Sequence, residues 1–281
     1  MFEALLSVAF GQTQNTVVAA MPPEVLGILS TLAINVLLCL PVILVTWLAT
    51  KRHKVTDLKT DFTNPRREAL LSIAVVLSIA LIVTTYIFSL YQSTGGPTGT
   101  PTEFYLERAL FQWGIYAVLF IFPVVAVLKL RHQGFETVGI TRKNAWFSIG
   151  LGIVLALGLS VLVTPIISDS SKVFTSSAFY GFVYFSAVGF GEELLFRGYL
   201  QIRCISWLGA VKGLVLASVI MALIHLPQRM FAVGLDPMQA VASAVSLIPI
   251  SLALGYLMLS TKNTLGPAIM HIILDWVSSI V

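Results

Sequence analysis

The sequence predicts an all-α protein, a polytopic transmembrane helix bundle of about eight spans, and three observations support this prediction. The chain has 281 residues, of which 57% are hydrophobic and only 11% are charged, whereas about 25% of the residues in a soluble domain are charged. The mean hydropathy is +0.91. Apolar runs of about 18–20 residues, long enough to cross roughly 30 Å of hydrocarbon, recur along the whole chain. Helices are expected because they satisfy their own backbone groups in lipid.

The apolar runs define the expected helices in chain order. They cover residues 25–49, 69–91, 109–130, 146–168, 179–203, 211–228, 238–259 and 264–281. The sixth run is short and ends at Pro227, and the eighth opens after a Gly-Pro pair. The first four spans, within residues 1–170, carry no motif, whereas residues 171–281 do. Residues 1–24 have only a short apolar patch and no basic region, so we do not expect a cleaved signal peptide.

The loop charges predict the orientation of the helices. Loop 51–68 carries six basic residues and loop 129–145 carries four, whereas the 92–102 segment between them carries none. Because basic residues are enriched in cytoplasmic loops, the first two loops are expected in the cytoplasm and both termini outside. The net charge is only +4 and the basic residues lie in short loops, so the expected partner is the lipid bilayer and not nucleic acid.

The last third of the chain holds ionisable residues inside its predicted spans. They are Glu192, Glu193, Arg197, His225, His271 and Asp275. A charged side chain near the middle of a bilayer costs roughly 2.5–3.5 kcal/mol on insertion scales, so such residues are retained for function. Depth can be counted from the cytoplasmic helix ends at about 1.5 Å per residue. By this count four of these residues lie about 14 to 20 Å deep, namely Glu192, His225, His271 and Asp275. This common depth predicts one shared, water-accessible cavity that is reached from the cytoplasmic side.

Helix geometry separates the two glutamates. Glu193 and Arg197 are four residues apart with the acid first, which is the favourable order for an ion pair. Glu192 points about 100° away from that face and has no partner on its own helix. A carboxylate of this kind is suited to take a proton from water, and His225 could share that task.

The remaining pair, His271 and Asp275, is also four residues apart, so the two side chains project together. The arrangement predicts that Glu192 and His225 activate a water molecule and that His271 stabilises a developing oxyanion.

These segments resemble the CPBP family of intramembrane proteases (CAAX protease and bacteriocin-processing, or "Abi"), which includes the type II CAAX prenyl endopeptidases. The marks of that family are EExxxR, FxxxH and HxxxN or HxxxD, each on a different helix. The matching segments are Glu192–Arg197, Met221–His225 and His271–Asp275, with methionine in place of the phenylalanine of the second mark. The resemblance covers roughly residues 178–281, so residues 171–281 are expected to form the protease core.

The resemblance implies an intramembrane endopeptidase that hydrolyses a peptide bond near the cytoplasmic membrane face. It assigns water activation to Glu192 and His225, the oxyanion hole to His271 with residue 275, and a site-organising role to Glu193 and Arg197. The expected partner is a membrane-associated peptide or protein, in a bacterial plasma membrane. Whether that substrate is prenylated stays open, because bacterial-type members resemble processors of unprenylated peptides.

Asp275 stands where other members of the family have asparagine. An ionised carboxylate cannot donate a hydrogen bond to an oxyanion, so Asp275 would be protonated, orient His271 or bind a metal. The favoured mechanism needs no cofactor. In the alternative mechanism, a divalent metal such as zinc is held by Glu192, His225, His271 and Asp275.

Two alternatives of another functional class stay open. Intramembrane carboxylates and histidines also build substrate sites in transporters, but a transporter predicts repeat symmetry, and the first half of this chain is nearly free of membrane-embedded charge. A family member without proteolytic activity could act as a membrane binding or immunity protein. The presence of Glu192, His225 and His271 argues against this loss.

Overall fold

The computed structural model describes residues 23–58, 62–99, 103–163 and 173–280. These residues contain helices and no strand, so the predicted all-α class is confirmed. The first 22 residues of the chain and the predicted end of the 146–168 span lie outside the described residues.

The four expected spans of the first half are helical. They correspond to α3 (Pro23–Arg52), α4 (Pro65–Thr94), α5 (Leu106–Tyr116) with η2 (Ala117–Ile121) and α6 (Phe122–Leu130), and α7 (Ala145–Val163). The turn η2 is π-helical, and a short 3-10 turn, η3 (Phe135–Val138), lies between α6 and α7.

The second half also follows the predicted order. Its elements are α8 (Ser176–Glu193), η5 (Leu194–Gln201), α9 (Ile202–Leu208), α10 (Ala210–Ile224), η6 (Gln228–Ala232), α11 (Pro237–Val245), α12 (Leu247–Thr261) and α13 (Leu265–Ile280). The turns η5 and η6 are π-helical.

Five helical segments are long and apolar enough to cross a membrane. They are Ser30–Arg52, Pro65–Thr94, Leu106–Leu130, Ala210–Ala232 and Pro237–Thr261. Two shorter apolar helices, Ala145–Val161 and Leu265–Ile280, complete this set among the described residues. The helix that runs through α8, η5 and α9 is absent from both groups and carries charged residues at its centre. The number of eight crossings therefore stays a prediction.

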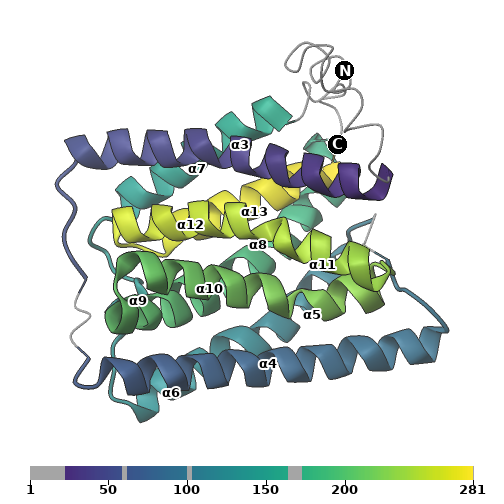
Figure 1. Cartoon of the computed structure of the whole chain (residues 1–281), viewed down its shortest axis with the longest axis horizontal. Coiled ribbons are helices and arrows are strands. Elements are labelled where there is room, and N and C mark those ends of the chain that lie inside the picture. Colours follow the sequence, from purple (N-terminus) through teal and green to yellow (C-terminus); the bar gives the residue numbers. More distant parts are fainter. Residues whose placement is uncertain (1–22, 59–61, 100–102, 164–172, 281) are drawn as a thin grey trace.

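The helices run roughly parallel to one another, and their connections gather at two ends (Figure 1). The α3–α4 and α6–α7 loops, which carry most of the basic residues, lie at one end, and the α4–α5 connection lies at the other. We call the first the basic-loop end and the second the opposite end. In the middle, α13 packs on α7 and α8, and α10 packs on α12. The first-half helices cover this group from both sides, α3 against α12 and α5 against α8.

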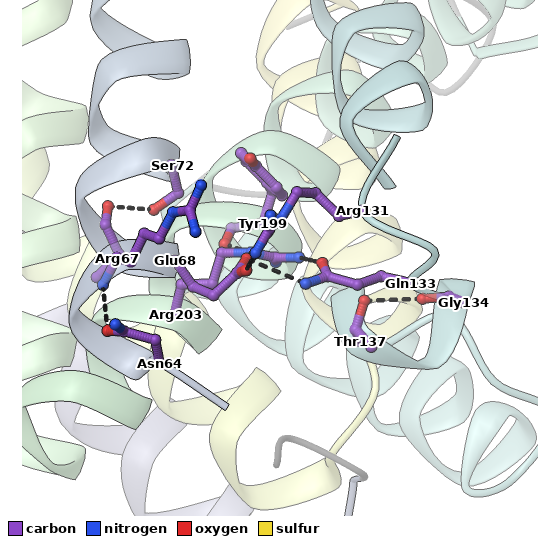
Figure 2. Close-up of polar contacts among 11 residues, drawn as sticks. Asn64, Arg67, Glu68, Ser72, Arg131, Gln133, Gly134, Thr137, Tyr199 and Arg203 are labelled. Atoms are coloured by element: carbon purple, nitrogen blue, oxygen red, sulfur yellow. Dashed lines mark hydrogen bonds and ion pairs between the residues drawn. The ribbon is translucent and has the colours of Figure 1, made fainter. Parts of the chain in front are cut away.

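A buried polar cluster closes the basic-loop end (Figure 2). Glu68 of α4 accepts hydrogen bonds from Arg131 at 2.5 Å and from Gln133 at 3.0 Å. Arg203 of α9 donates to the side-chain oxygen of Gln133 at 2.5 Å and to the carbonyl oxygen of Tyr199 at 3.1 Å. Glu68 and Arg203 are both buried. The cluster therefore joins α4 to the helix that carries the paired glutamates.

Gly152 marks the closest approach of α7 to α13. A Cβ atom at this position would lie 2.3 Å from the carbonyl oxygen of Gly266 and 2.6 Å from the Ile269 side chain. Because the contact is with a backbone atom, the added methyl group can be accommodated only if the two helices move apart. We therefore expect Gly152→Ala to lower the free energy of unfolding by about 1–3 kcal/mol. Gly150, on the same helix, has no atom within 4 Å of a built Cβ. Gly150→Ala is the matched control and should melt at or above the wild-type temperature in detergent. Equal melting temperatures for the two variants would contradict the close approach.

Candidate active site

The helix that carries the two glutamates changes its winding directly after them. α8 ends at Glu193 and continues into η5, a π-helical turn in which every residue is buried. Turns of this kind inside α-helices occur frequently at functional sites. The two adjacent carboxylates contact different neighbours, Glu192 on one side and Glu193 on the other.

Glu192 lies between α5 and the end of α10. Its Oε1 accepts a hydrogen bond of 3.0 Å from the hydroxyl of Tyr116. Its Oε2 lies 3.8 Å from Nε2 of His225. Both neighbours come from other helices, as the direction predicted for Glu192 requires.

The tautomer of His225 follows from its backbone contact. Nδ1 of His225 lies 2.7 Å from the carbonyl oxygen of Met221. Because a carbonyl only accepts hydrogen bonds, Nδ1 carries a proton, and in the neutral form of the ring Nε2 is an acceptor. Two acceptors, this Nε2 and Oε2 of Glu192, therefore face each other across 3.8 Å. A water molecule about 2.8 Å from each atom would donate a hydrogen bond to both.

Glu193 forms the ion pair with Arg197 that the sequence spacing predicts. Nη1 of Arg197 lies 3.0 Å from Oε1 of Glu193, and the two side chains are 2% and 0% exposed. Nη2 of Arg197 also donates to the carbonyl oxygen of Ser251 at 3.4 Å, which ties η5 to α12. Since both charges are fully buried, each depends on its partner for neutralisation.

His271 lies between two carboxylates. Its Nδ1 is 2.9 Å from Oε1 of Glu193, and its Nε2 is 3.3 Å from Oδ2 of Asp275. The predicted contact between His271 and Asp275 is thus present. Both ring nitrogens face carboxylate oxygens in this arrangement, and the oxyanion role of His271 stays a prediction.

A pocket of about 610 Å³ lies beside Glu192 and His225. Tyr116 also lines it, and its sides are formed by the second half of α4, the first half of α5 and η6. Thr98 and Gly99, from the segment that follows α4, line it as well, so the pocket reaches the opposite end of the bundle.

The lining of this pocket bears on two expectations about the cavity. Glu192 and His225 line it, whereas His271 and Asp275 are not among its lining residues. It also extends toward the opposite end and not toward the basic loops. The reason is local, because α10 stops at Ile224 and the chain turns into η6, which leaves room there. At the basic-loop end, Arg203 is engaged with Gln133 and Glu68 in a buried cluster.

The four residues also do not fit a metal ion. In the residues that the structure describes, no three His, Cys, Asp or Glu side chains are gathered so that they could hold one. The quartet divides instead into two pairs, Glu192 with His225 and His271 with Asp275.

Tyr116 is a site residue that the motifs did not identify. It belongs to α5 and stands 76 residues before Glu192, in a span without any motif. The signal in the sequence was a tyrosine inside a predicted membrane span, because a buried tyrosine hydroxyl usually finds a hydrogen-bond partner. That signal does not reveal which partner it finds.

The comparison with known families agrees with the motifs. Residues 174–277 match the family described as type II CAAX prenyl endopeptidase Rce1-like, which confirms the predicted family over this stretch. The match contains all the motif residues and leaves out Tyr116. No curated protein and no solved structure matches the chain. Together with the apolar helices, this match over residues 174–277 indicates an integral membrane protein.

Proposed function

Starting from the Rce1-like family, we propose that the protein is an intramembrane endopeptidase whose attacking water is held between Glu192 and His225. The observation that carries this proposal is the approach of Oε2 of Glu192 to Nε2 of His225, 3.8 Å apart, beside a pocket. Both atoms are hydrogen-bond acceptors, and a water molecule that donates to two acceptors presents its lone pairs to a carbonyl carbon.

The reaction follows from this placement. Glu192 takes one proton from the water while the water oxygen bonds to the carbonyl carbon, and the π electron pair moves to the carbonyl oxygen. When this intermediate collapses, the C–N bond breaks and the proton on Glu192 passes to the leaving nitrogen. The second hydrogen stays on the water oxygen and donates a hydrogen bond to Nε2 of His225, which fixes the direction of attack. This mechanism needs no metal or other cofactor.

The remaining motif residues organise the site. Arg197, Glu193, His271 and Asp275 alternate in charge along one chain of contacts, with distances of 3.0, 2.9 and 3.3 Å. This chain joins η5 to α13 and, through the carbonyl oxygen of Ser251, to α12. It fixes the helix on which Glu192 sits, and a catalytic group must be held to well within about 1 Å of its working position.

The pocket also suggests the side from which a substrate enters. With the basic loops in the cytoplasm, the opposite end faces the other compartment, and the pocket extends to that end. The substrate is therefore a membrane-associated peptide or protein whose cleaved bond enters from the non-cytoplasmic half. This replaces the cytoplasmic opening that we expected from depth alone.

Replacing His225 by asparagine tests the proposal. Asparagine keeps an N–H donor for the carbonyl oxygen of Met221 but has no counterpart of Nε2. We expect the wild-type protein in liposomes to cleave members of a quenched fluorescent peptide library, and His225→Asn to lower kcat by about 10²–10³-fold.

The control for this variant is His132→Asn, an exposed loop position outside the site, which should leave the rate unchanged. A chelator should also leave the rate unchanged. Loss of activity on chelation with recovery on zinc addition would favour the metal-dependent alternative. A wild-type protein that cleaves nothing, or equal rates for wild type and His225→Asn, would contradict the proposal and favour a binding or transport function.

A further inference from the structure

Hydrolysis at this site requires a hydrogen-bond donor for the oxyanion, and the motif residues leave none available. Both ring nitrogens of His271 are engaged with carboxylates, Nδ1 at 2.9 Å from Glu193 and Nε2 at 3.3 Å from Asp275. An ionised carboxylate has no proton to give. Nδ1 of His225 donates to the carbonyl oxygen of Met221. The donor must therefore come from elsewhere on the pocket wall.

Tyr116 supplies such a group. Its hydroxyl lies 3.0 Å from Oε1 of Glu192 and donates to it, which places a neutral O–H beside the reacting atoms. Tyr116 also lines the pocket that holds Glu192 and His225. Gln112 and Gln228 line the same pocket, but no contact joins either of them to Glu192 in the described part of the chain.

The ring of Tyr116 is held by two contacts. It stacks on Phe120 with 4.4 Å between ring centroids and an interplanar angle of 14°. It also lies against Gly191, where a built Cβ would come within 2.6 Å of the ring carbon Cδ1. Glycine at 191 therefore creates the space that lets the ring reach the residue after it, Glu192. A rigid donor of this kind needs little reorganisation during the reaction.

We propose that the hydroxyl of Tyr116 is the oxyanion donor of this peptidase, an inference that rests on the function proposed above. In the resting site, the hydroxyl donates to the negative charge on Glu192. When Glu192 takes the proton from water, that charge moves to the carbonyl oxygen of the peptide, and the O–H of Tyr116 turns to follow it. As the C–N bond breaks, the carbonyl reforms and the hydroxyl returns to Glu192. Tyr116 keeps its proton throughout.

The decisive variant is Tyr116→Phe, which removes one oxygen atom and keeps the ring stacked on Phe120. We expect kcat on the cleaved reporter peptide to fall by about 10²–10³-fold while KM stays within about threefold of wild type, since the contact forms only in the transition state. The melting temperature in detergent should not change. Tyr180→Phe, on α8 and outside the pocket, is the matched control and should behave as wild type.

A second variant disturbs the donor without deleting a polar group. In Gly191→Ala, the added methyl group displaces the Tyr116 ring, and kcat should fall in the same direction. The third measurement uses a phosphinate analogue of the cleaved peptide, which carries an anionic tetrahedral centre. Its affinity should fall in Tyr116→Phe by about the same factor as kcat/KM.

The outcomes separate this inference from the function on which it rests. A Tyr116→Phe variant with kcat within about threefold of wild type, while Glu192→Gln is inactive, leaves the peptidase standing and overturns the role of Tyr116. The same holds if kcat falls but the phosphinate binds unchanged, since Tyr116 would then only position Glu192. If the wild-type protein cleaves no peptide, the function and this inference fall together.

Discussion

Replacing Glu192 by glutamine is expected to abolish most peptide cleavage, with kcat lowered by about 10³-fold or more. Glutamine has nearly the same shape, and its amide oxygen can still accept the hydrogen bond from Tyr116. It cannot take a proton from water, so the chemical step is lost while the surroundings stay in place. The measurement is initial-rate cleavage of a reporter peptide in liposomes, together with the melting temperature in detergent.

The control for this variant is Glu107→Gln, which removes an exposed carboxylate from α5 and should leave the rate unchanged. A Glu192→Gln protein that retains more than about a tenth of the wild-type kcat would rule out Glu192 as the proton acceptor, because general-base catalysis contributes about 10²–10⁴-fold. A variant that is inactive and also unfolded would point to a structural role instead.

Replacing Arg197 by methionine is expected to cost about 3–5 kcal/mol of stability. Glu193 would then stay fully buried with His271 as its single remaining cation, and its second oxygen has no hydrogen-bond partner even in the wild-type protein. Removing one member of a buried ion pair is costly because it leaves the charge of the other uncompensated. The measurement is denaturant unfolding in detergent micelles.

The double variant Glu193→Gln with Arg197→Met shows whether the charge is the cause. It removes both members of the pair, so it should be more stable than Arg197→Met alone despite carrying one more substitution. A double variant that is less stable than the single one would contradict this explanation and indicate that packing of the arginine side chain dominates.

The motif residues could be identified from the sequence because their chemistry follows from residue type and helical spacing. Glu193 with Arg197 and His271 with Asp275 are contacts within one turn, and both are present at 3.0 and 3.3 Å. The approach of Glu192 to His225 joins two helices, and it could be expected only from depth and from the family resemblance.

Contacts that depend on how helices cross could not be predicted in this way. His271 reaches Glu193 because α13 packs closely on α8 at Gly189, where a built Cβ would lie 2.6 Å from the Ile272 side chain. No periodicity in the sequence encodes that crossing, and it places Nδ1 of His271 against Glu193. Tyr116 was missed for the same reason.

The direction in which the pocket beside Glu192 extends could not be predicted, because depth along a helix does not say where space remains. The end of α10 at Ile224 and the turn into η6 border this pocket toward the opposite end. At the basic-loop end, Glu68 and Arg203 form buried polar contacts. Such packing becomes visible only when the helices are assembled.

That buried cluster has a consequence for how the protein is made. Glu68 is near the start of α4, and Arg203 comes from a helix synthesised 135 residues later. Until α9 is in place, Glu68 lacks one of its two arginine neighbours, and Gln133 lacks the donor to its side-chain oxygen. The polar contacts at the start of α4 are thus completed only after the segment that follows the paired glutamates has been made.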